Sequence, residues 1–109
     1  MEKNQYIPVM IQSLKKKSEI LDAIMELNIR QSEELENPAL DPDDFDKTVE
    51  EKSKQIEQLD LLDDGFQELF DRVKDDLKNH QDFYRDEIAQ MQDYIRKLTS
   101  KSATIQVQE

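Results

Sequence analysis

The stretch that decides the predicted fold is Pro38-Ala39-Leu40-Asp41-Pro42-Asp43-Asp44. Pro38 disfavours helical geometry in the residue before it, so a preceding helix should end near Asn37. Asp41 can cap a new helix, Pro42 suits the first helical position, and the two acids that follow complement the helix dipole. The link is then only residues 38–40, and so short a link predicts two antiparallel helices that lie side by side.

The residues before this stretch predict a first helix over about residues 6–36. Apolar residues recur there at heptad spacing, as Ile7 and Leu14 do, and a second apolar row complements them. Pro8 is tolerated because it falls in the first turn, where its missing N–H has no partner to lose. Asn28 stands at a core heptad position, and two interpretations stay open: it faces water, or it fixes the register of an oligomeric core.

The residues after the stretch predict a second, much longer helix over about residues 42–98. Their apolar residues recur at alternating steps of three and four, the spacing of a coiled coil or a long bundle helix, and no proline interrupts them. The segment Asn79-His80-Gln81-Asp82 lacks apolar residues and could hold a break, with Asp82 capping a third helix. Because the apolar steps stay in phase across this segment, we predict one continuous helix.

The predicted fold class is all-α: a single domain built as an antiparallel hairpin of one shorter and one very long helix. Residues 99–109 are polar and predict a flexible tail. At 1.5 Å per residue the helices measure about 45 Å and about 85 Å, so the second overhangs the first by about 40 Å. The apolar face of this overhang needs cover from a second copy, from a fold-back of the C-terminal third, or from another protein. The simplest remedy is a homodimer that forms a four-helix bundle.

Composition excludes several classes of function. The 109 residues carry 26 Asp and Glu against 15 Lys and Arg, which gives a formal net charge of -11. So acidic a chain argues against nucleic acid as a partner, because binding phosphates needs clustered Lys and Arg. The single glycine argues against an all-β fold, and the absence of cysteine excludes a disulfide framework and suits a reducing cytoplasm. No apolar run is long enough to span a bilayer, so we expect no membrane insertion.

The sequence also lacks the side-chain combinations that catalysis and metal binding need. His80 is the single histidine, whereas a di-iron bundle needs two Glu-x-x-His pairs. The acidic run that starts at Asp41 lacks the glycine and the glutamate that a calcium loop requires at its sixth and twelfth positions, which are Asp46 and Lys52 here. We therefore predict no catalytic residues, no metal site and no cofactor.

Two segments resemble a known protein family. The segment Ile56-Glu57-Gln58-Leu59-Asp60-Leu61-Leu62-Asp63-Asp64-Gly65-Phe66, followed by Arg72-Val73-Lys74, is similar to the middle of small FlgN-like flagellar export chaperones of Gram-positive bacteria. The ending, Ile95 through Ile105-Gln106-Val107-Gln108-Glu109, resembles theirs too. The resemblance implies a cytoplasmic, all-helical chaperone for type III flagellar export, which holds hook–filament junction proteins by their C-terminal helical regions before secretion.

Such chaperones use their own C-terminal part, which here coincides with the predicted overhang. The implied partner is a helical segment of an exported flagellar protein, and the implied partner-binding residues are Leu77, Tyr84, Ile88, Met91, Ile95 and Leu98. Two alternatives stay open. One is a self-associating structural coiled coil without a client, and the other is a FliT-like chaperone that serves the filament cap.

Overall fold

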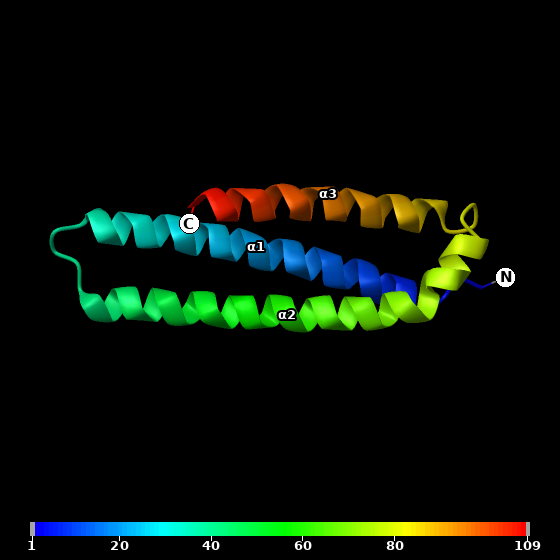
Figure 1. Cartoon of the computed structure of the whole chain (residues 1–109), viewed down its shortest axis with the longest axis horizontal. Helices are drawn as coiled ribbons and strands as arrows, with labels where there is room; N and C mark the ends of the chain where they lie inside the picture. Colours follow the sequence, from blue (N-terminus) through cyan, green and yellow to red (C-terminus); the bar gives the residue numbers. More distant parts are fainter. Residues whose placement is uncertain (1, 109) are drawn as a thin grey trace.

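Three helices make up the structure. The computed structural model describes residues 2–108, which form α1 (Tyr6–Glu36), α2 (Pro42–Asn79) and α3 (Arg85–Gln108), with no strand among them. α1 lies between the other two and packs against both, and α2 runs antiparallel to α1 and α3 (Figure 1). Among the described residues, no Cα atom of α2 lies within 8 Å of one in α3. The result is a slender all-α molecule of 63 × 20 × 16 Å in which the two outer helices do not touch along their backbones.

The turn between α1 and α2 confirms the interpretation of the Pro38–Asp44 stretch. α1 ends at Glu36, and Asn37 takes an extended conformation before Pro38. Asp41 caps α2, because its carboxylate accepts a hydrogen bond from the backbone N–H of Asp43 at 3.0 Å. The predicted bounds of the first helix and the predicted start of the second are therefore correct.

The prediction of one continuous helix over residues 42–98 is wrong. α2 ends at Asn79, residues 80–84 form a turn that we call the corner, and α3 starts at Arg85 and returns along α1 (Figure 1). The fold-back of the C-terminal third therefore covers α1, and the predicted overhang does not exist. The fold-back buries Tyr84, Met91 and Leu98 against α1. A straight second helix would leave these side chains in water without that apolar contact.

The prediction of a flexible tail over residues 99–109 is also wrong for residues 99–108, while Glu109 lies outside the described residues. α3 continues through them to Gln108. The Thr99 and Thr104 hydroxyls donate to the carbonyls of Ile95 and Ser100, at 2.9 and 3.2 Å. Lys101 ties the segment to α1, since its ammonium lies 2.9 Å from the carboxylate of Asp22 and 2.7 Å from the hydroxyl of Ser18. Polar anchors to α1, which local hydropathy does not reveal, keep this segment helical.

The buried core lies mainly along α1. α1 supplies half of the residues in the main buried cluster, and α2 supplies only Val73. The full cluster is Ile7, Met10, Leu14, Leu21, Val73, Tyr84, Met91 and Leu98. The other apolar residues of α2 that touch this core are only partly buried. α2 therefore keeps much of its apolar face uncovered.

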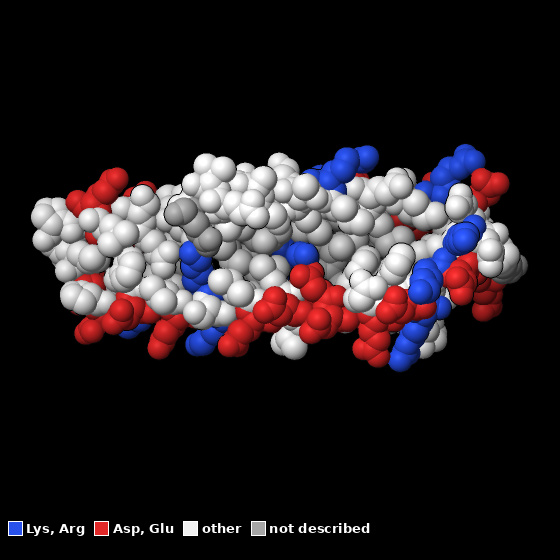
Figure 2. Space-filling model, viewed as in Figure 1, with Lys and Arg blue, Asp and Glu red and all other residues white. Residues whose placement is uncertain are grey.

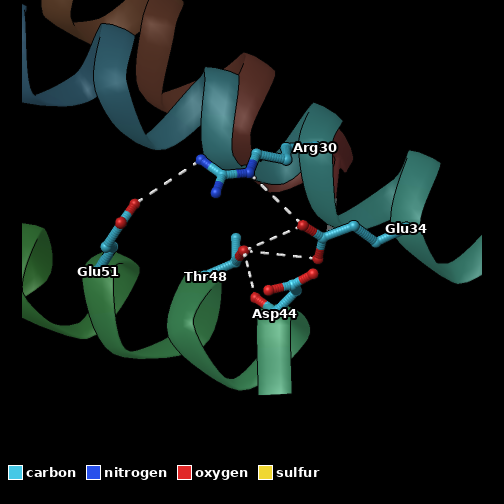
Figure 3. Close-up of polar contacts among 5 residues, drawn as sticks. All are labelled: Arg30, Glu34, Asp44, Thr48 and Glu51. Atoms are coloured by element: carbon cyan, nitrogen blue, oxygen red, sulfur yellow. Dashed lines mark hydrogen bonds and ion pairs between the residues drawn. The ribbon is translucent and has the colours of Figure 1, made fainter. Parts of the chain in front are cut away.

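Asn28 and Thr48 are buried polar residues on the helix interfaces. The side-chain amide of Asn28 donates to Gln108 Oε1 at 3.0 Å, so the interpretation in which Asn28 faces water is wrong. The Thr48 hydroxyl points from α2 towards α1 and donates to the Glu34 carboxylate at 3.2 Å and to the Asp44 carbonyl at 3.1 Å (Figure 3). Arg30 extends this contact towards Glu51 (Figure 3). These bonds set the register of α1 against both of its neighbours.

Candidate helix-binding groove

A groove separates α2 from α3, and α1 forms its floor. The half nearest the corner has a volume of about 830 Å³. Met10 of α1 lies at its base, and apolar side chains of the two outer helices form its walls: Phe66, Phe70, Leu77, Ile88, Met91 and Ile95. We call this half the corner pocket.

The groove continues along the molecule into a second half of about 490 Å³, which we call the middle pocket. Phe66 and Ile95 line both halves, so the two pockets are direct neighbours along the groove. Leu14 and Lys17 come from α1 here, and small side chains of α3 widen the space, including Ser102 and Ala103. Asp63 on the α2 wall neutralises Lys17 on the floor, at 2.6 Å.

The shape of the surface agrees with this description. Figure 2 shows acidic side chains gathered along α2, and a mostly uncharged, hollowed strip between α2 and α3. Phe70 and Ile95, on opposite walls, expose 38% and 46% of their surface. Apolar side chains this exposed on both sides of one channel are typical of a surface that contacts another molecule.

The corner that separates α2 from α3 is fixed by residues from the start of the chain. The phenol of Tyr84 donates to Asp76 at 2.9 Å and accepts a hydrogen bond from the backbone N–H of Asn4 at 2.9 Å. Lys3 pairs with Glu87, which holds the pKa of that carboxyl below its ordinary value, and lies over the ring of Phe83. The segment before α1 thereby helps to position the start of α3 against the end of α2.

The six predicted partner-binding residues divide into two groups in the structure. Leu77, Ile88 and Ile95 line the groove with accessible surface. Tyr84, Met91 and Leu98 expose no more than 7% of their surface and belong to the core that packs α3 against α1, although Met91 and Leu98 also border the pockets. The groove, rather than an overhanging helix, therefore brings half of the predicted residues together, with Leu77 on the α2 wall and Ile88 and Ile95 on the α3 wall.

Sequence reasoning missed the aromatic residues of the α2 wall and the floor that α1 forms. Phe66 and Phe70 stack with ring centroids 6.4 Å apart, and Met10 lies beneath them in the corner pocket. Their i, i+4 spacing on α2 was visible in the sequence as part of the apolar pattern. The pattern does not predict the fold-back of α3, which places the second wall of the groove opposite Phe66 and Phe70.

The groove offers binding surface rather than reactive groups. Within residues 2–108, no three metal-ligating side chains lie close enough together to hold an ion. None of the helices in the same range combines the length and the apolar character that crossing a bilayer requires. No family model, curated protein or solved structure matches the chain.

Proposed function

We propose that this chain is a binding protein that receives an amphipathic helix of a partner in the groove between α2 and α3. The observation that carries the proposal is the gap between the two outer helices, whose Cα atoms do not come within 8 Å of each other and which leave a largely apolar groove above α1. A fourth helix laid there would complete a four-helix bundle. Apolar side chains at helical spacing would meet an apolar helix face, as in other helix-in-groove contacts.

The resemblance to FlgN-like chaperones gives this binding role a biological setting. In our proposal the partner is the C-terminal helical region of a hook–filament junction protein, held in the cytoplasm before type III export. The residues that carry the resemblance support this setting. So does the position of Leu77, Ile88 and Ile95 on the two walls of the groove. Such a role needs neither a catalytic residue nor a cofactor, and we propose none.

Replacing Phe70 and Ile95 with serine tests the proposal. The two side chains stand on opposite walls and are accessible, so the double variant should fold while losing apolar contact with the partner. Burying such a side chain contributes about 1.5–3 kcal/mol, so losing two should weaken binding by at least about 100-fold. Calorimetric titration with the C-terminal helical segment of the hook–filament junction protein measures this effect.

The matched control replaces Leu61 and Val107 with serine, two apolar residues that are also exposed but do not line the groove. This control should bind as the wild type does. Unchanged binding by the Phe70→Ser/Ile95→Ser variant would contradict the proposed site. If the segment does not bind, and light scattering shows that the groove variant alone loses a dimer present in the wild type, the structural coiled-coil function replaces the chaperone function.

A further inference from the structure

The corner pocket carries charge of the opposite sign to the chain as a whole. The chain has a formal net charge of -11. The charged residues that line the corner pocket are three basic ones and one acidic one: Lys74, Lys78, Arg85 and Asp82. Figure 2 shows several basic side chains, with acidic ones beside them, towards the end of the molecule where α2 passes into α3.

The chain itself neutralises these basic groups only weakly. Arg85 lies 3.7 Å from Asp82, and Lys74 lies 4.0 Å from Asp71, with all four side chains more than half exposed. Ion pairs this exposed contribute little to stability. Lys78 has no ion-pair partner among residues 2–108. All three basic groups can therefore turn to a bound molecule without breaking a strong internal contact.

The positive charge is confined to one end of the groove. In the middle pocket, Lys17 and Asp63 neutralise each other at 2.6 Å, and the remaining polar lining is uncharged. A ligand that fills both pockets therefore meets Met10 and Leu14 on the floor, and a net basic rim only at the corner. From Arg85 to Gln106 the groove follows α3 for about 32 Å, the length of a helix of about 20 residues.

We infer that the occupant is an amphipathic partner helix whose apolar face is flanked by acidic residues at the end that lies over the corner. This inference rests on the proposed helix-binding function and adds the charge and the orientation of the partner. Contacts within the groove act over a few ångströms, whereas the acidic surface elsewhere is screened beyond about 8 Å at physiological salt. The local basic rim therefore outweighs the net charge of the chain, which by itself would favour a basic partner.

Two synthetic peptides of about 20 residues test the inference. Both carry the same leucine and isoleucine face at helical spacing, flanked at one end by glutamate in the first peptide and by lysine in the second. Fluorescence anisotropy at about 0.15 M salt should show that the glutamate peptide binds about tenfold more tightly. The Lys74→Glu/Lys78→Glu/Arg85→Glu variant should reverse the preference, because it makes the rim acidic.

The control variant Lys15→Glu/Lys16→Glu/Lys54→Glu changes the net charge equally at exposed residues outside the groove, and it should keep the preference for glutamate. If both peptides bind equally and both lose binding to the Phe70→Ser/Ile95→Ser variant, the charge inference is overturned while the helix-binding function stands. If neither peptide binds the wild type, both are overturned. A dimer of the free protein that the Lys74→Glu/Lys78→Glu/Arg85→Glu variant dissociates makes a second copy the occupant and overturns the assignment of a separate partner.

Discussion

At the scale of single residues, Tyr84 links three parts of the chain. Its ring is buried, and its hydroxyl joins Asp76 at the end of α2 to the backbone of Asn4 before α1. Burial raises the pKa of the Tyr84 phenol above its ordinary value, the Asn4 N–H acts in the opposite direction, and the nearby carboxylate of Asp76 raises it further. Sequence reasoning placed Tyr84 on a client surface because its spacing fits the apolar pattern, but the same spacing serves the core once the chain turns back.

Ionisation of Tyr84 should destabilise the folded chain at alkaline pH. The folded pKa lies above the unfolded value of about 10, so the stabilisation is fully present below about pH 10 and is lost as the pH rises through the folded pKa. We expect the Tm to fall as the pH rises above about 10, and to fall less in the Tyr84→Phe variant. Thermal melts followed by circular dichroism measure both.

A second group titrates in the same alkaline range. The pKa of Lys3 is also raised, chiefly by its hydrogen bond with Glu87, and this adds a loss of stability of the same sign to both proteins. The difference between the wild type and Tyr84→Phe therefore isolates the phenol. An equal fall in Tm for both proteins would show that Tyr84 does not titrate in a buried site.

At the scale of helices, the sequence predicts α1 and the start of α2 correctly because local chemistry determines them. Pro38, Asp41 and Pro42 act within one turn of where they stand. The end of α2 is different, because no glycine or proline marks residues 80–84. The corner is held by Lys3 and Asn4, which lie more than 70 residues away along the chain. Helix periodicity cannot detect such contacts, and for the same reason it could not assemble the groove, whose walls come from both sides of the corner.

Gly65 is the weakest position within α2, and replacing it should stabilise the protein. A β-carbon added there meets no atom within 4 Å, and the glycine does not take a positive φ. Alanine in a helix interior is favoured over glycine by about 1 kcal/mol. We expect Gly65→Ala to raise the midpoint of urea unfolding without changing the slope of the transition. A lower midpoint would mean that α2 needs the flexibility of a glycine at this position.

At the scale of the whole molecule, the apolar face of the C-terminal third has to pack against another helix, as the helix lengths predicted from the sequence indicate. The chain supplies that cover itself by folding α3 onto α1, with a Cα radius of gyration of 17.8 Å. This fold-back covers one side of α1 and leaves the groove between α2 and α3 open. The same apolar pattern therefore serves two purposes: Tyr84, Met91 and Leu98 hold the chain together, and Leu77, Ile88 and Ile95 remain accessible to a partner.

Spin labels at Asp22→Cys and Lys101→Cys test the fold-back directly, because the natural sequence contains no cysteine. These residues form an ion pair between α1 and α3, so labels there should lie within about 20 Å of each other. A continuous second helix would carry residue 101 about 65 Å from the part of α2 that lies opposite Asp22. The two substitutions also remove the bond between Lys101 and Ser18, so circular dichroism of the labelled protein should first show that its helix content matches the wild type.

Dilution with excess unlabelled protein separates a fold-back within one chain from an exchange of α3 between two chains. Both arrangements bring the two labels close, but only the exchanged dimer loses the short distance when each labelled chain pairs with an unlabelled one. We expect the short distance to persist, because Lys3 and Asn4 hold the corner from within the same chain. Loss of the short distance would mean that the apolar steps, which stay in phase across residues 79–82, have formed the long helix and that α3 covers α1 of a second copy.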